Sequence, residues 1–194
     1  MSYGRSFLMK LQLLFVAAFL FSACGDHTHP KMTGNPENEY RSETKSFIDY
    51  IRTTESPYGT IVLVDTPAMK PLMACQDFLS RSIISLNPDE QKAVKAQFSD
   101  PPLKLWDTSL VKARILRGDT LAVILKDRTR WWRFHEQYGG YDYYSAPIFL
   151  RNYTLCVFSS YHYCGSLCGE GKITLYQKED GQWKPVESFC RWIS

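Results

Sequence analysis

The stretch YCGSLCGEG, residues 163–171, holds the densest group of side chains in this chain that could do chemistry. Cys164 and Cys168 stand four positions apart, and His162 lies just upstream. Thiols and imidazoles bind zinc, and two thiols form either a redox centre or a structural disulfide. The spacing of these residues decides between a catalytic and a structural interpretation.

Three of the candidate chemistries fail on spacing. A phosphate-binding loop needs a glycine five residues before a Gly-Lys pair, but Ser166 stands at that position. A thioredoxin-type centre needs C-x-x-C, whereas the spacing here is C-x-x-x-C. Zinc needs a fourth ligand besides His162, Cys164 and Cys168, and no second ligand pair accompanies them. We therefore expect a Cys164–Cys168 disulfide that closes a turn, with neither a metal nor a cofactor.

The other cysteines leave alternatives open. A second disulfide between Cys156 and Cys190 would need a curved sheet, because we expect one strand between theirs. Cys75 has no assigned partner. An oxidising compartment, in which disulfides persist, is indicated by the N-terminus.

Residues 1–23 have the composition of an export signal. Arg5 and Lys10 precede and flank the apolar run LQLLFVAAFLF, which is too short to span a bilayer, and two small residues lead to Cys24. The sequence FSAC resembles the lipobox of bacterial lipoproteins. The resemblance implies cleavage before Cys24 and attachment of acyl chains, palmitate among them, to this cysteine, which would anchor the protein stably in a membrane.

This signal sets the expected organisation of the chain. We expect a signal peptide over 1–23, a flexible tether over 24–35 and a single domain over 36–194, and a start at Met9 would give a complete signal of the same kind. The residue after Cys24 does not resemble the aspartate that retains lipoproteins at the inner membrane, which favours the outer membrane. Loss of the two basic residues of the signal lowers the net charge from +3 to +1. No basic block is left that would indicate nucleic acid binding, so the expected contacts are the membrane and a protein or glycan partner.

The domain divides by composition into a helical N-terminal part, 36–105, and a β-rich part, 106–194. Asn35-Pro36-Glu37 and Asn87-Pro88-Asp89 each combine a helix cap, a proline at the first helical position and an acidic first turn. They predict helices over 36–53 and 88–98. The run GTIVLVDTP predicts a strand between the two helices, and helix is favoured over the ambiguous segment 68–86.

The β-rich part predicts an antiparallel sheet. The runs VKARIL and LAVIL flank the turn Arg117-Gly118-Asp119 and predict a hairpin, and a short helix is expected over 129–138. Asp180-Gly181 predicts a hairpin turn between the last two strands. The fold class is therefore α+β, an antiparallel β-meander in the C-terminal half packed against the N-terminal helices, which cover one face. The expected strands are 143–149, 153–163, 171–178 and 183–193.

The last fifty residues carry a specific pattern. It runs through CGSLCGEG, then Gly181-Gln182-Trp183-Lys184, and ends in Trp192-Ile193-Ser194. This pattern resembles the C-terminal part of a group of uncharacterised exported bacterial proteins and lipoproteins. The resemblance implies a shared sheet module and no catalytic residues.

The segment WWRFHEQYGGYDYY, residues 131–144, is the candidate binding surface. Aromatic rings present large apolar areas, and tyrosine and histidine add polar tips, as in grooves that bind sugars or peptides. The competing interpretation, which we favour, places Trp131 and Phe134 in the core and the tyrosines in a half-exposed loop. The residues of the candidate surface are Trp131, Arg133, His135, Tyr141, Tyr143 and Tyr144.

No catalytic residue is assigned from the sequence, because neither G-x-S-x-G nor H-E-x-x-H occurs. The favoured hypothesis is a non-catalytic binding or protective module, which captures a protein or glycan or inhibits a toxin or lytic enzyme. One alternative is an envelope hydrolase that uses His135 and Glu136, and another is a structural subunit of an envelope assembly. The hydrolase would need a deep pocket in which His135 meets a carboxylate or a cysteine.

Overall fold

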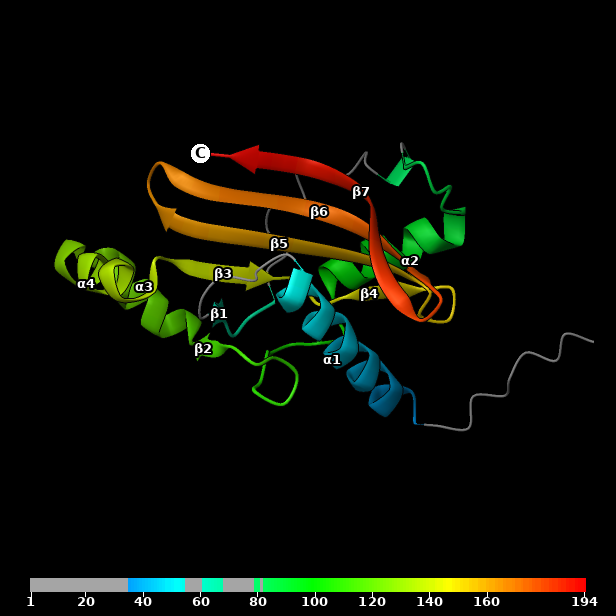
Figure 1. The fold of residues 1–194 in the computed structure, drawn as a ribbon, viewed down its shortest axis with the longest axis horizontal. Coiled ribbons are helices and arrows are strands. Elements are labelled where there is room, and N and C mark those ends of the chain that lie inside the picture. The colour runs from blue at the N-terminus through cyan, green and yellow to red at the C-terminus, as the bar shows by residue number, and fades with distance from the viewer. Residues whose placement is uncertain (1–34, 55–60, 68–78, 81) are drawn as a thin grey trace, which may run out of the picture. The chain divides into compact units, whose positions relative to one another are not determined.

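The computed structural model describes residues 35–54, 61–67, 79–80 and 82–194. The residues from Pro36 onward form one compact unit (Figure 1). Its helices and strands follow the chain as α1 (Pro36–Thr54), β1 (Val62–Val64), α2 (Pro88–Ser99), β2 (Arg114–Leu116), α3 (Gly118–Lys126), α4 (Arg128–Tyr138), β3 (Tyr141–Tyr144), β4 (Ile148–Leu150), β5 (Leu155–Gly165), β6 (Cys168–Glu179) and β7 (Gln182–Ile193).

The strands form one mixed sheet, and the α+β class is confirmed. The order across the sheet is β2-β1-β3-β5-β6-β7, and β4 pairs with β5 beside this path. Strands β3, β5, β6 and β7 form the antiparallel meander, whereas β1 runs parallel to both β2 and β3. The single strand predicted over 143–149 is two strands, because the chain leaves the ladder at residues 145–147 between β3 and β4.

The hairpin predicted around Arg117-Gly118-Asp119 is wrong. Strand β2 is present, but the run LAVIL that follows is part of helix α3. Strand β2 pairs parallel to β1, so no antiparallel partner strand follows it, and the chain continues directly into helix α3. At the start of this helix the Gly118 amide donates a hydrogen bond to Asp65 Oδ1 at 3.1 Å. The hairpin was predicted in error because the periodicity of a short apolar run does not distinguish a strand from a helix.

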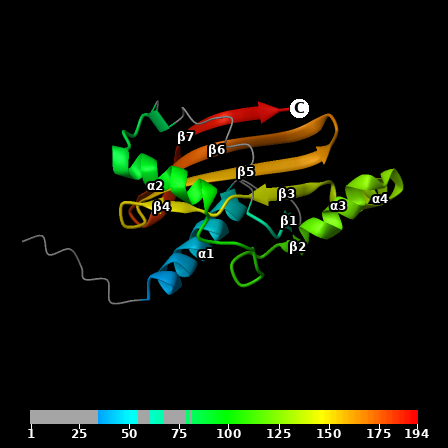
Figure 2. The ribbon, with the colours of Figure 1, turned by 180° about the vertical axis from the view of Figure 1, so that it is seen from behind.

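Helices lie on both faces of the sheet, so the expectation that they cover one face is wrong. Side chains alternate between the faces along a strand. Phe158 and Tyr176 pack against Phe47 of α1 on one face, whereas Val157 and Leu175 share a cluster with Val94 of α2 on the other. Figures 1 and 2 show α1 and α2 on opposite sides of the sheet.

Both predicted helix starts are present, and α1 is fixed to the sheet at its middle. Helix α2 begins with a complete capping box between Asn87 and Glu90. On α1, Glu43 accepts hydrogen bonds from Lys178 Nζ and from Trp183 Nε1, the latter at 3.2 Å. The Lys178 ammonium also lies 4.9 Å from the centre of the Trp183 ring.

The Cys164–Cys168 disulfide is confirmed. It closes the turn between β5 and β6, and a loop this short contributes about 2 kcal/mol in the chain-entropy account. The open alternative, a Cys156–Cys190 bridge, is wrong, because Cys156 is a buried free thiol. Cys156 packs against the α1 side, whereas Cys190 packs with the α2 cluster and is disulfide-bonded, but not to Cys156. Cys24, Cys75, the signal peptide and residues 24–34 of the tether lie outside the described residues.

Candidate functional site

Three of the six candidate surface residues form one aromatic cluster. Trp131, Tyr141 and Tyr143 belong to the cluster that packs α3 and α4 against β1 and β3. Tyr141 lies opposite Tyr163 in the ladder, and their rings stack with centres 5.5 Å apart. The Trp131 ring meets Tyr141 edge-on at 6.1 Å. Burial raises the pKa of Tyr141 to about 12, so its hydroxyl stays neutral over the physiological range.

The other three residues are placed differently. Tyr144 lies on the opposite face of the sheet, almost fully buried beside Phe158. It directly follows Tyr143 in β3, and successive side chains of a strand point to opposite faces. Arg133 is exposed on α4, and the His135 ring lies 5.7 Å from that of Trp131. Among the described residues, no carboxylate or cysteine forms a hydrogen bond or ion pair with His135. The predicted set is therefore not one continuous surface.

Local backbone features set the position of this cluster. The Asp127 side chain caps α4 by accepting hydrogen bonds from the amides of Thr129 and Arg130, which fixes where the helix begins. The helix ends at Gly139, whose φ of 73° is the left-handed conformation that favours glycine. Gly140 follows with its α-carbon against the Tyr163 carbonyl, where a Cβ would overlap. This approach brings β3 beside β5.

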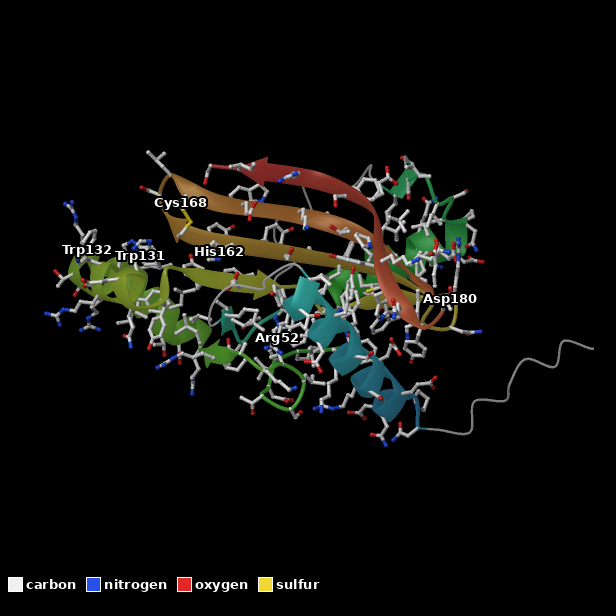
Figure 3. All side chains as sticks on the ribbon, viewed as in Figure 1. Arg52, Trp131, Trp132, His162, Cys168 and Asp180 are labelled. Atoms are coloured by element: carbon white, nitrogen blue, oxygen red, sulfur yellow. A yellow bond between two sulfur atoms is a disulfide. The ribbon has the colours of Figure 1, made fainter. Side chains whose placement is uncertain are left out.

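A groove runs between the two helices and the disulfide-closed turn. Its volume is about 490 Å³, and the turn contributes Gly165 and Ser166. Figure 3 shows Trp131 and Trp132 of α4 at the same end of the domain as Cys168. The groove thus joins the two segments that the sequence singles out. Its lining comprises Leu125, Lys126, Arg128, Trp131, Tyr141, Tyr163, Gly165 and Ser166.

The helices and the turn that form the groove carry exposed apolar side chains. Leu125 is 51% exposed, and Leu167, at the tip of the turn, is 88% exposed. Val123 and Trp132 on the same helix pair are 49% and 67% exposed. Sequence reasoning missed α3 and Tyr163 here, although Tyr163 could have been found once β3 and β5 were paired in register.

The glycines of the 163–171 stretch have a packing role. Trp192 stacks on Tyr161 with ring centres 6.3 Å apart, and it lies over Gly169 and Gly171. A Cβ at Gly171 would overlap both Tyr161 and the Trp192 indole. The pattern CG-x-G followed by a late tryptophan is therefore one packing unit across β6 and β7.

A second concavity lies on the α1 side of the same strands. It has a volume of about 120 Å³, and its lining includes Asp142, His162, Glu170, Lys172 and Arg191. His162 Nδ1 is hydrogen-bonded to Asp142 Oδ1 at 2.9 Å. This hydrogen bond, together with the charges of Asp142 and Glu170, raises the pKa of His162 above its ordinary value of 6.5. We call this site the polar hollow.

From the sequence, His162 was considered only as a zinc ligand, and its hydrogen bond with Asp142 was not predicted. Among the described residues, no three His, Cys, Asp or Glu side chains are grouped so that they could hold a metal ion. The helices in this part of the chain are too short or too polar to cross a bilayer. Comparison with known protein families, curated proteins and solved structures gives no match.

Proposed function

We propose that the protein is a lipid-anchored envelope protein whose domain binds an acidic partner protein in the groove between α3, α4 and the disulfide-closed turn. The observation that carries this proposal is the groove itself, with aromatic and leucine walls and a basic rim. Inhibition of a toxin or lytic enzyme would be one form of such binding.

The apolar part of the argument rests on exposure. Helix α3 is rich in apolar residues, but only Leu121 among them is fully buried. A helix that is apolar on most sides is ordinarily covered on most sides, and exposed apolar patches of this kind mark interaction sites. Tryptophan, tyrosine and arginine, which supply four of the eight residues that line the groove, are the residue types that contribute most to protein interfaces.

The basic part of the argument concerns the rim. Lys126 and Arg128 line the groove, and neither forms an ion pair with any described residue. Arg130, by contrast, is paired with Asp127 at 3.3 Å. A partner with carboxylates at its contact surface would supply the missing charges and gain speed of association.

A protein is favoured over a glycan, and binding over hydrolysis, by the way the side chains are used. Sugars stack on open aromatic faces, but the faces of Tyr141 and Tyr163 are turned toward each other. The ring of His135 contacts Trp131, and Glu136 is exposed to solvent, so the two do not form a general acid–base pair in the described structure.

Selection from a displayed peptide library on the immobilised full chain would test the groove. We expect enriched peptides to combine acidic and apolar residues and to bind a Leu125→Ser/Arg128→Gln variant at least about tenfold more weakly. An Ile83→Ser/Lys104→Gln variant is the matched control, since Ile83 is 78% exposed and lies outside the groove lining. Selected peptides without acidic residues, equal binding to both variants, or selective retention of glycans in a parallel glycan array would contradict the proposal.

The anchor is tested separately. If Cys24 carries the lipid, Cys24→Ala should move the protein from the membrane fraction to the soluble fraction, because the acyl chains supply the membrane affinity. Immunoblotting of the two fractions measures the change. An unchanged distribution would refute lipid anchoring without affecting the groove.

A further inference from the structure

The polar hollow is an ordered row of charges across three strands. The ladder pairs Asp142 of β3 with His162 of β5, and His162 with Glu170 of β6. Lys172 is two residues further along β6 on the same face. Helix α1 contributes only the apolar side chain of Ile51 to the described lining, and every charged residue of this described lining lies on a strand.

His162 is held in one orientation. Its Nδ1 is occupied by Asp142, whose side chain is only 16% exposed, whereas the His162 side chain is 41% exposed. A histidine fixed through Nδ1 has its Nε2 available for another partner. The neighbouring carboxylates favour the protonated imidazolium, in which Nε2 is a donor.

An irregularity in β7 brings Arg191 to the same hollow. Between the pairs Ile173–Phe189 and Gly171–Trp192, β7 has one more residue than β6. This bulge lets Phe189 and Trp192 both pack on the α2 side and turns Arg191 toward the α1 side. Cys190 within the bulge has a φ of 52°, which is a strained conformation for a non-glycine residue. Bulges of this kind commonly redirect a side chain at a binding site.

We propose that the polar hollow binds an oxyanion group, a carboxylate or a phosphate, of a small ligand between His162, Lys172 and Arg191. Protonation of His162 adds a positive charge and an Nε2–H donor beside the Lys172 and Arg191 side chains that line the hollow. Binding is therefore stronger at low pH, and it discriminates against larger anions because the cavity is about 120 Å³.

Titration of the full chain in detergent with sulfate and, separately, with acetate tests this site. Both anions keep a constant charge between about pH 6 and pH 8, so only the protein titrates in this range, and the side-chain NMR signal of His162 reports binding. His162→Gln identifies the signal. We expect a saturable shift whose affinity is at least about fivefold higher at pH 6 than at pH 8. A stronger response to sulfate would indicate a phosphate-type ligand, and a stronger response to acetate would indicate a carboxylate.

Two variants and a control make the test specific. Lys172→Gln and Arg191→Gln should each weaken the shift several-fold, and neither side chain is buried in the core, so the fold should be kept. Lys184→Gln removes the same charge from β7 outside the hollow lining and should leave the affinity unchanged. Absence of a saturable shift, an affinity independent of pH, or equal losses in all three variants would overturn the proposal.

Discussion

Strands β5 and β6 present two different surfaces, because alternate residues point to opposite sides of the sheet. On the α2 side, Tyr161, Gly169 and Gly171 lie under Trp192 and form a tightly packed unit. On the α1 side, the intervening residues His162 and Glu170 lie in an open row of charges. The same short stretch of sequence thus combines a packing motif with part of the proposed anion site.

The CGSLCGEG stretch contributes to both surfaces through different residues. Its glycines and its disulfide belong to architecture, since they allow an indole to lie against the sheet and close the turn. Glu170, which stands between the two glycines, belongs to the polar side. Substitutions on the packed side should therefore cost stability, whereas those on the polar side should change ionisation and binding with little loss of stability.

The largest expected effect is on the packed side. Gly171→Ala places a methyl group where Tyr161 and the Trp192 indole already lie, and overpacking of this severity costs about 3 kcal/mol. Urea unfolding measures the loss. Gly118→Ala is the matched control, because a Cβ there meets nothing closer than 3.7 Å, and it should change the stability by less than about 1 kcal/mol. Equal losses for both variants would show that Trp192 does not close over Gly171.

Much of the fold could be predicted because its signals are local. The cap-and-proline signals of α1 and α2, the Asp180-Gly181 turn, and the short disulfide each depend on a few adjacent residues. The hairpin at Arg117-Gly118-Asp119 failed because its outcome depends on β1, about fifty residues earlier, which takes β2 as a parallel partner. The expectation that the helices cover one face was wrong for the same reason, because it also depends on contacts between residues that are far apart in the sequence.

The candidate sites divide in the same way. Strand alternation by itself places Tyr143 and Tyr144 on opposite faces, so the sequence held the information that would have separated them. The groove could not be predicted, because it needs α3, which was assigned as a strand. The polar hollow depends on the register that sets Asp142 opposite His162 and on the bulge that redirects Arg191, and neither feature has a sequence signal short enough to recognise.

The smallest expected effect is on the polar side and concerns Asp142. Because the hydrogen bond that this carboxylate accepts from His162 raises the pKa of the imidazole, Asp142→Asn should lower that pKa toward 6.5, as measured by NMR titration of His162. A pKa that is higher in the folded than in the unfolded state stabilises the fold below the unfolded value, and this stabilisation is lost as the pH rises through the folded value. The stability difference between the wild type and the variant should therefore be larger at about pH 5.5 than at about pH 8.5. The change should be less than about 1 kcal/mol, because the His162 side chain is 41% exposed and solvent screens the interaction. An unchanged His162 pKa in the variant would mean that the two faces do not differ as described, since the row of charges would then have no electrostatic coupling.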